Sequence, residues 1–155
     1  FGGVRRRFER RGEAGGVAFV DDYAHLPTEL AAAVSAGRGG GWDRVVAVFQ
    51  PHRFSRTEAL WSTYADAFVG VDLLVLTGIY AAGEAPRDGV SGRLILDAVT
   101  AAHPDLPTVY VEDRHELAST IASILRPGDL CLTLGAGDIT ALADEVRAMV
   151  DGKDA

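Results

Sequence analysis

Phe49-Gln50-Pro51-His52-Arg53-Phe54-Ser55-Arg56-Thr57 is the stretch from which both the fold and the site of this chain can be predicted. It continues an apolar run that begins at Val45 and is typical of a strand buried on both faces of a parallel sheet. The proline ends the strand, and a helical pattern begins shortly afterwards. The loop between them carries His52, Arg53 and Arg56. Guanidinium groups bind carboxylates and phosphates through charge-assisted hydrogen bonds, so this strand exit predicts an anion site.

A second polar cluster, residues 21–29 (DDYAHLPTE), follows the apolar run 17–20 in the same manner. In an open parallel sheet, the loops beyond the carboxyl ends of the strands share one edge. We therefore expect the loops at 21–28, 50–57, 78–88 and 135–138 to lie on the same side. The two polar clusters would then form neighbouring walls of one pocket.

Apolar runs alternate with helical patterns of about 10–15 residues along the whole chain, which predicts a parallel sheet. The expected strands are 4–10, 17–20, 45–49, 73–77, 109–111 and 130–134. The expected helices begin at 28, at a cap on Ser55 or Thr57, at 90, at 112 or 113, and after 138. We expect Gly37 to end the first helix and Trp61 to pack in the core. The predicted fold class is α/β: a doubly wound, mostly parallel, Rossmann-like sheet with an N-terminal β-hairpin.

Composition narrows the possible partners. The 155 residues are 48% hydrophobic and 24% charged, as in an ordinary globular domain, and the length suits one domain. A net charge of −7 argues against nucleic acid or an anionic membrane as the main partner. Residues 1–12 depart from this average, with five arginines against one glutamate, a local charge of +4. A solvated edge strand is the simplest reading of these arginines.

Features of the chain ends and of the single cysteine predict a cytoplasmic location. Cys131 lies in an apolar run, which predicts a buried, inert thiol and fits a reducing compartment. No stretch reaches the roughly 18 apolar residues of a membrane span, and the N-terminus lacks a signal-peptide pattern. Because the first residue is Phe1 rather than methionine, we expect the chain to be a piece of a longer protein.

Each polar motif also has a plainer interpretation. Arg53 and Arg56 could be a surface pair, but arginine is unfavourable at a helix N-terminus, which favours an anion there, helped by free helix N–H groups. The carboxylates of Asp21 and Asp22 could bind a ribose or magnesium, or could simply cap a turn. His25 precedes a helix N-terminus, where an imidazole can reach an anion. The segment 135–138 (GAGD) falls short of a dinucleotide fingerprint and is a weak signal.

Five segments, taken together in their order and spacing, resemble the C-terminal domain of the Mur ligase family. They are 1–9 (FGGVRRRFE), 21–29 (DDYAHLPTE), 49–57 (FQPHRFSRT), 79–84 (IYAAGE) and 135–138 (GAGD). The likeness is greatest to members that join L-alanine to UDP-N-acetylmuramate. It implies that residues 1–155 form one domain of a three-domain enzyme, without the UDP-binding and ATPase domains.

The resemblance implies a ligase of peptidoglycan precursor synthesis with L-alanine, ATP and UDP-N-acetylmuramate as partners. ATP would phosphorylate the muramic acid carboxylate, and the amine of alanine would attack the acyl phosphate. Mg²⁺ would be held mainly by the ATPase domain, with no metal ligand in this chain. The domain would pack against that ATPase domain and would be inactive alone, because the chain has no G-x-x-x-x-G-K-[ST] phosphate loop.

The implied roles of individual residues follow the motif positions. Arg53 and Arg56 would bind the alanine carboxylate, and His52 and Tyr23 would line the same pocket. Asp22 would meet the ATP ribose. His25 would lie near the terminal phosphate or the incoming amine, as cofactor contact and catalytic residue. Leu26 stands where the family usually has a second histidine, so the contribution of that imidazole is open.

Three other functions are compatible with parts of the sequence. A sister ligase that recycles a tripeptide onto UDP-N-acetylmuramate would differ in the segment 49–57. A stand-alone small-molecule binding module would lack a phosphate loop upstream. A phosphorelay receiver domain would need an acceptor Asp after its third strand and a Lys after its fifth. Asp72 precedes its strand and Lys153 is the only lysine, which argues against a receiver.

Overall fold

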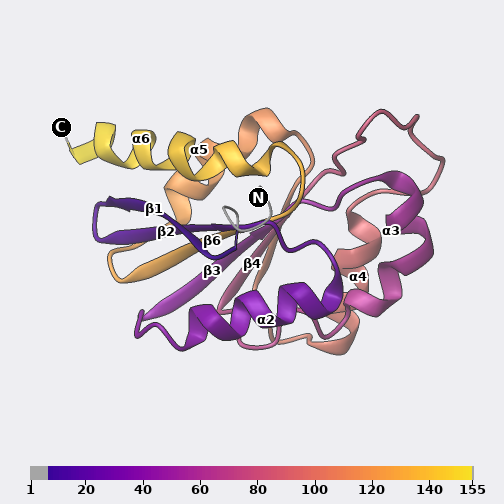
Figure 1. Cartoon of the computed structure of the whole chain (residues 1–155), viewed down its shortest axis with the longest axis horizontal. Coiled ribbons are helices and arrows are strands. Elements are labelled where there is room, and N and C mark those ends of the chain that lie inside the picture. The colour runs from indigo at the N-terminus through magenta and orange to yellow at the C-terminus, as the bar shows by residue number, and fades with distance from the viewer. Residues whose placement is uncertain (1–6, 155) are drawn as a thin grey trace.

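A six-stranded sheet forms the centre of the computed structural model, which describes residues 7–154 (Figure 1). The strands are β1 (Glu9–Ala14), β2 (Val17–Asp22), β3 (Arg44–Phe49), β4 (Leu73–Thr77), β5 (Thr108–Val111) and β6 (Asp129–Leu134). Their order is β1-β2-β6-β3-β4-β5, with β1 antiparallel to β2 and the other four pairings parallel. The predicted doubly wound, mostly parallel sheet with an N-terminal hairpin is confirmed.

Helices cover both faces of the sheet. They are α2 (Pro27–Arg38), α3 (Phe54–Leu60), α4 (Arg93–Ala102), α5 (Arg114–Ile124) and α6 (Leu142–Asp154), with 3-10 turns η1 (Trp61–Tyr64) and η2 (Asp138–Ala141). Figure 1 shows α5 and α6 on one face and α2 and α4 on the other. None of the helices in the described part of the chain is long and apolar enough to cross a membrane.

Side-chain alternation along the strands divides the core into two layers. Val45, Ala47 and Phe49 of β3 pack with Leu30, Phe68 and Val99 on the α2, η1 and α4 side. The intervening Val46 and Val48 pack with Leu117 and Val146 on the α5 and α6 side. Successive strand residues point to opposite faces, so an uninterrupted apolar run is the pattern that a sheet covered on both sides requires.

The hairpin is shifted from its predicted position. Its first strand runs from Glu9 to Ala14 rather than from 4 to 10, and residues 1–6 lie outside the described part. The turn is only Gly15-Gly16, both at positive φ (57° and 78°), which glycine adopts at little cost. Gly12, predicted as part of the turn, lies within β1 at a register shift between Arg10 and Glu13.

The arginines of the first strand are not all solvated, which corrects the edge-strand prediction. The Arg11 side chain is only 19% exposed and lies 3.5 Å from the buried carboxylate of Asp21. It also donates to the Thr140 hydroxyl at 3.0 Å and to Glu9 at 2.7 Å. Arg11 thus ties the edge strand to the segment after β6, a long-range contact that no local pattern indicates.

Two other local predictions were wrong for packing reasons. Gly37 does not end α2, which continues to Arg38. The glycine is there for packing, because a β-carbon would approach the Leu130 side chain to 3.1 Å. Trp61 is 38% exposed rather than a core residue, because the helix changes to a 3-10 turn at that point. Cys131, as predicted, is buried, and burial raises the pKa of its thiol to about 12.

Candidate functional site

The loops after β2, β3 and β4 meet at one edge of the sheet, as expected from parallel strands. The rings of His25 and His52 lie 6.2 Å apart, although they follow different strands. Tyr23 packs edge-on against His25 at 5.3 Å between ring centroids. Tyr80, from the loop after β4, stacks on His52 at 5.6 Å. The structure therefore brings the two predicted polar clusters together and adds Tyr80, which the sequence did not single out.

His25 is held in one orientation by its surroundings. Its Nδ1 lies 3.2 Å from the Tyr23 carbonyl oxygen and 3.5 Å from Glu29 Oε1. Because these oxygens only accept, Nδ1 carries the hydrogen of the neutral ring, and Nε2 is left as an acceptor. The His25 carbonyl accepts from the Tyr64 hydroxyl at 2.7 Å. Burial raises the pKa of Tyr64 to about 12, so this hydroxyl remains a donor. The His25 ring can accordingly take up a proton at Nε2.

The start of α2 contributes to this orientation. Glu29 accepts from the backbone N–H of His25 at 3.2 Å and of Leu26 at 3.1 Å. Burial alone would raise the pKa of Glu29, but these N–H groups, with His25 and Arg7, lower it. Glu29 is therefore a carboxylate that caps the helix from within, the arrangement of a capping box.

Asp22 makes structural hydrogen bonds with both of its carboxylate oxygens. Oδ2 accepts from the Phe8 N–H at 2.9 Å, and Oδ1 accepts from the Ala24 N–H at 2.8 Å. Burial nevertheless raises the pKa of Asp22. Within the chain, Asp22 therefore acts as the plainer interpretation predicts, by capping the turn that follows β2. A hollow of about 420 Å³ lies beside it, lined also by Arg7, Thr28 and alanines of α2.

Arg53 and Arg56 stand at the start of α3, and their contacts differ. Arg56 Nη1 lies 3.2 Å from His52 Nδ1 and 3.4 Å from the His52 carbonyl oxygen. Arg53 is exposed, and its guanidinium makes no hydrogen bond or ion pair within residues 7–154. Its backbone is held instead, because its N–H donates to the Tyr80 carbonyl at 2.8 Å. One guanidinium is thus braced against an imidazole while the other faces solvent.

The N–H groups at the start of α3 are not all free, which corrects one part of the prediction. Neither Ser55 nor Thr57 caps the helix; its N-cap is Arg53. Glu84, from the loop after β4, accepts from the Ser55 N–H at 3.0 Å and from its hydroxyl. The Ser55 hydroxyl, then its N–H, lowers the pKa of Glu84. The carboxylate that balances this helix start therefore comes from the chain itself, and an anionic ligand would depend on the guanidiniums.

His52 is positioned as a neutral ring. Burial, followed by the charge of Arg56, of His25 when that ring is protonated, and of Arg53, lowers its pKa. Since Arg56 can only donate, His52 Nδ1 is the acceptor of that contact and its hydrogen lies on Nε2. A bound anion between the arginines would offset the positive charge and favour protonation of this ring.

Stability should fall on acidification partly because of His52. Its folded-state pKa is lowered, so the unfolded chain binds a proton at higher pH, and the free energy of unfolding decreases below about pH 6.5. The decrease ends once the pH passes the lower pKa of the folded state. Urea unfolding between about pH 8 and pH 5 should show a smaller loss for His52→Gln than for the wild type. Identical losses would contradict this environment for His52.

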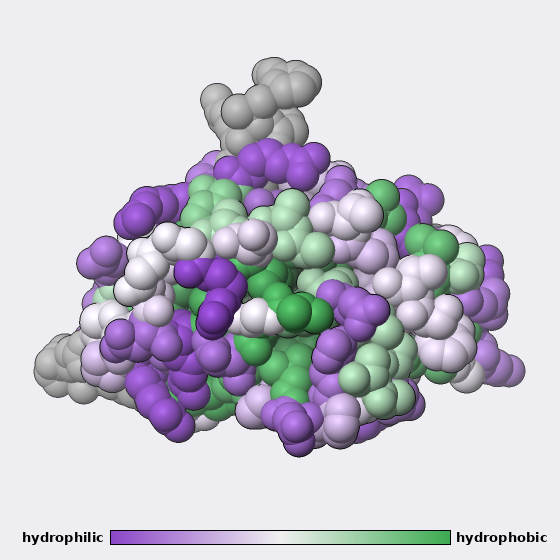
Figure 2. All heavy atoms as spheres, turned by 90° about the horizontal axis from the view of Figure 1, so that it is seen from below, coloured by the Kyte–Doolittle hydropathy of each residue, from purple (hydrophilic) through white to green (hydrophobic). Residues whose placement is uncertain are grey.

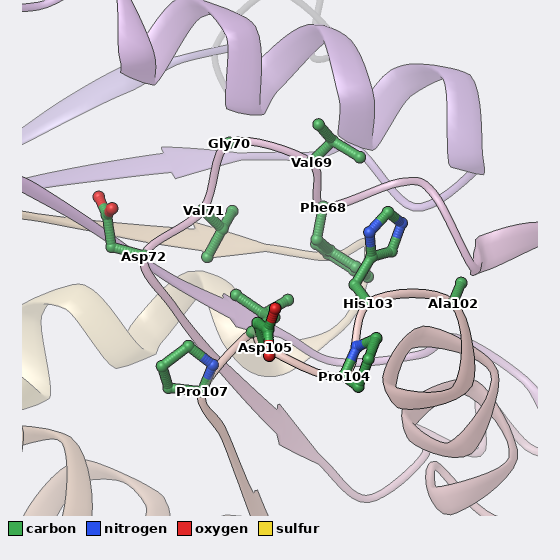
Figure 3. Close-up of a pocket in the computed structure, with 11 residues that line it drawn as sticks. Phe68, Val69, Gly70, Val71, Asp72, Ala102, His103, Pro104, Asp105 and Pro107 are labelled. Carbon is green, nitrogen blue, oxygen red and sulfur yellow. The ribbon is translucent and has the colours of Figure 1, made fainter.

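A cavity larger than the hollow beside Asp22 lies elsewhere. It measures about 500 Å³ and is formed by residues 68–72 before β4 and 102–107 before β5, at the opposite end of these strands (Figure 3). Figure 2 shows that hydrophobic residues also gather in the middle of the α2 and α4 side. We assign the site to the other edge, because the arginines and histidines converge there. The charged side chains that line this cavity are two aspartates, and it has a single histidine and no arginine.

No magnesium-binding cluster is visible in the described residues 7–154, where no three His, Cys, Asp or Glu side chains come together to hold an ion. Asp21, the other acidic candidate, is fully buried and accepts from the hydroxyls of Thr133 at 2.7 Å and Thr140 at 3.0 Å. These aspartates thus stabilise the end of β2. Gly135–Asp138 forms the turn into η2, as predicted.

The sequence of this chain matches a known family model and curated ligases. The family model described as "Mur ligase, glutamate ligase domain" matches residues 6–137. UDP-N-acetylmuramate–L-alanine ligases of Rubrobacter xylanophilus and of an Anaeromyxobacter species are 45% and 48% identical over 96% and 97% of the chain. The chain spans about a third of the length of these curated relatives (34% and 32%).

Two solved structures share the fold. The UDP-N-acetylmuramate–alanine ligase of Thermotoga maritima superposes with a TM-score of 0.76 at 24% identity, over 96% of this chain and 30% of that one. A domain of a putative tripeptide ligase from Haemophilus ducreyi gives a TM-score of 0.66 at 21% identity, over 93% of this chain and 99% of that one.

Proposed function

This chain belongs to the Mur ligase family through its glutamate ligase domain, and on that premise we propose that it serves the ligation of L-alanine to UDP-N-acetylmuramate. In this proposal, residues 1–155 are the C-terminal domain of a three-domain, ATP-dependent enzyme of peptidoglycan precursor synthesis. The identity of 45–48% to L-alanine ligases supports the choice of substrate. The free, buried thiol of Cys131 supports a cytoplasmic location.

The observation that carries the proposal is the convergence of two arginines and two histidines from separate loops at one edge. Arg53 and Arg56 bind the carboxylate of L-alanine, because a guanidinium presents donors in a fork that matches a carboxylate. His52 and Tyr23 line the same pocket. The amino acid is then held by its negative end, with its amine left free to react.

His25 acts on the amine. In the ligation, the amine nitrogen attacks the acyl phosphate carbonyl, the carbon–oxygen bond to phosphate breaks, and the nitrogen loses a proton. The acceptor lone pair of His25 Nε2, exposed by the Nδ1 contact to Tyr23, can take that proton. In this proposal, the His25 ring also lies close to the terminal phosphate of ATP.

Asp22 accepts a hydrogen bond from a hydroxyl of the ATP ribose in this proposal, because a carboxylate oxygen can accept more than one hydrogen bond. Each of its oxygens accepts one backbone N–H and keeps a further lone pair. The 420 Å³ hollow beside it supports a nucleotide at this position. In this proposal, Mg²⁺ would be held mainly by the ATPase domain of the longer protein.

Turnover by the longer protein that contains this chain tests the proposal. With ATP, UDP-N-acetylmuramate and L-alanine, it should release ADP and phosphate and form the L-alanyl product, as detected by mass spectrometry. The murein tripeptide in place of L-alanine should give no product. Product with the tripeptide alone would instead support the recycling ligase, and binding without ADP release would support a small-molecule binding module.

The 155-residue chain alone should be inactive. It has no phosphate loop, so ATP lacks the Lys and backbone cradle that bind its β- and γ-phosphates. We expect phosphate release in the presence of all three substrates to stay at the buffer background. Alanine-dependent phosphate release by a pure preparation of this chain would show that the expectation is wrong.

A further inference from the structure

Gln50 is a buried amide at the point where two neighbouring loops diverge. It directly follows β3 and is 3% exposed. β3 leads to α3 on one face, whereas the adjacent strand β6 leads to α6 on the other face. Such a divergence opens a crevice at the carboxyl ends of the strands, where ligands of open α/β sheets bind.

The side chain of Gln50 joins the end of β3 to the turn after β6 with two hydrogen bonds. Its Nε2 donates to Asp138 Oδ1 at 2.7 Å, and its Oε1 accepts from the Ile139 N–H at 3.2 Å. Its backbone N–H donates to the Leu134 carbonyl at 3.1 Å. All three partners belong to β6 or to the turn that follows it. An amide is needed, because one atom must donate and its neighbour must accept.

This turn contacts Tyr80 through a glycine. A β-carbon on Gly137 would lie 2.6 Å from Tyr80 Cγ and 2.8 Å from Gln50 Oε1. No side chain fits that space, so the backbone of Gly137 lies directly against the aromatic ring. The position of the 135–139 turn thereby limits the position of Tyr80.

Tyr80 in turn positions the proposed anion-binding residues. Its ring stacks on His52 at an interplanar angle of 22°. Its N–H donates to the Pro51 carbonyl at 2.9 Å, and its carbonyl accepts from the Arg53 N–H at 2.8 Å. His52 then braces Arg56. A continuous series of contacts therefore runs from the Gln50 amide to the guanidinium of Arg56 and to the backbone of Arg53.

We infer that Gln50 is a positioning residue: its amide holds the turn after β6 against Tyr80 and so orients His52, Arg53 and Arg56 for the carboxylate of the amino acid. The inference rests on the proposed function and deepens it. Gln50 itself touches no substrate in this scheme. Asp138 shares the task, and Arg114 donates to Asp138 Oδ1 at 3.3 Å and to its carbonyl at 3.2 Å.

Gln50→Glu in the full ligase tests the inference with a change of only one atom. The glutamate cannot donate to Asp138 and places a second carboxylate against it. We expect the KM for L-alanine to rise roughly 10- to 100-fold, as for small misplacements of binding groups, while the KM for UDP-N-acetylmuramate stays unchanged. Adding Asp138→Asn restores a donor opposite the new carboxylate and should return the KM for L-alanine to within about threefold of wild type.

Two further variants separate positioning from stability. Gly137→Ala keeps both hydrogen-bonding groups of Gln50, but its β-carbon pushes against Tyr80 and the Gln50 amide oxygen, so it should raise the KM for L-alanine like Gln50→Glu. Thr77→Val removes a buried hydrogen bond of 2.7 Å to the Val111 carbonyl at the end of β4. It should lower the melting temperature and leave every KM unchanged. A Gln50→Glu enzyme with a lower melting temperature and an unchanged KM for L-alanine would overturn the inference. A double variant in which Asp138→Asn does not restore the KM for L-alanine would also overturn it.

Failure of the proposed function gives a different pattern. In that case the wild-type ligase does not turn over L-alanine, while the contacts can still be measured in the 155-residue chain by NMR. The His52 ring signals should shift in Gln50→Glu and return toward wild type with Asp138→Asn, because His52 stacks on Tyr80. Unchanged His52 signals in Gln50→Glu would overturn the inference whatever the substrate is.

Discussion

Arg53→Ala is expected to raise the KM for L-alanine about 10- to 100-fold in the full ligase. Losing a charged hydrogen bond costs about 1.5–3 kcal/mol, and about 1.4 kcal/mol corresponds to a factor of ten. The Arg53 guanidinium makes no hydrogen bond or ion pair to residues 7–154, so its removal leaves no buried partner unsatisfied there. Steady-state kinetics at saturating ATP and UDP-N-acetylmuramate measure the effect.

Arg38→Ala is the matched control for this experiment. Arg38 lies in the last turn of α2, is 56% exposed and reaches Asp72 at 3.8 Å near the start of β4. The same loss of a guanidinium there should leave the KM for L-alanine unchanged. An unchanged KM in Arg53→Ala, or an equal rise in both variants, would refute the role assigned to Arg53.

The backbone of Arg53 is strained, and substitution by glycine separates this strain from the charge of the side chain. Its φ of 75° and ψ of 137° lie where residues with a β-carbon are strained, at a cost of about 1–3 kcal/mol. Arg53→Gly and Arg53→Ala both lose the guanidinium, but only the glycine relieves this strain. We expect equal KM values, with the glycine variant about 1 kcal/mol more stable to urea. The strain would thus be a cost of placing a guanidinium at this position.

Phe49→Ala is expected to lower the free energy of unfolding by about 3–5 kcal/mol. Phe49 is fully buried at the end of β3 and packs against Tyr64 at 5.7 Å and Phe68 at 5.5 Å between ring centroids. Truncation would leave a cavity beside the rings of Tyr64 and Phe68 that the surrounding strands cannot fill. Since domains are stable by only about 5–15 kcal/mol, this loss is a large fraction of the total stability.

Val69→Ala provides the comparison for the core variant. Val69 follows Phe68 directly but is 64% exposed, so it compares truncation of an exposed apolar side chain with truncation of a buried one. Its truncation should change the free energy of unfolding by no more than about 0.5 kcal/mol. Circular dichroism during urea unfolding would measure both variants. A loss below about 1 kcal/mol for Phe49→Ala would contradict the packing of this core.

The strands were predictable because each apolar run is also a continuous stretch of sequence. Leu73–Thr77 was predicted at its observed bounds, and Leu130–Leu134 differs by one residue at its start. Helix ends were less predictable, because Gly37 is retained inside α2 by close packing on Leu130. The start of α3 depends on Glu84, which lies 29 positions after Ser55.

The sequence by itself determined the doubly wound sheet and the edge at which the polar loops meet, and it supplied the residues of the proposed anion site, because hydrophobic alternation and strand exits are local patterns. Only the tertiary structure decided which partners hold those residues. Gln50 reaches Asp138 across 88 positions, and Arg11 reaches Thr140 across 129. Hydrogen bonds at such separations depend on strand order and on the face that each loop takes. Neither is encoded in a short segment, so the groups that orient the site became visible only when β6 was placed between β2 and β3.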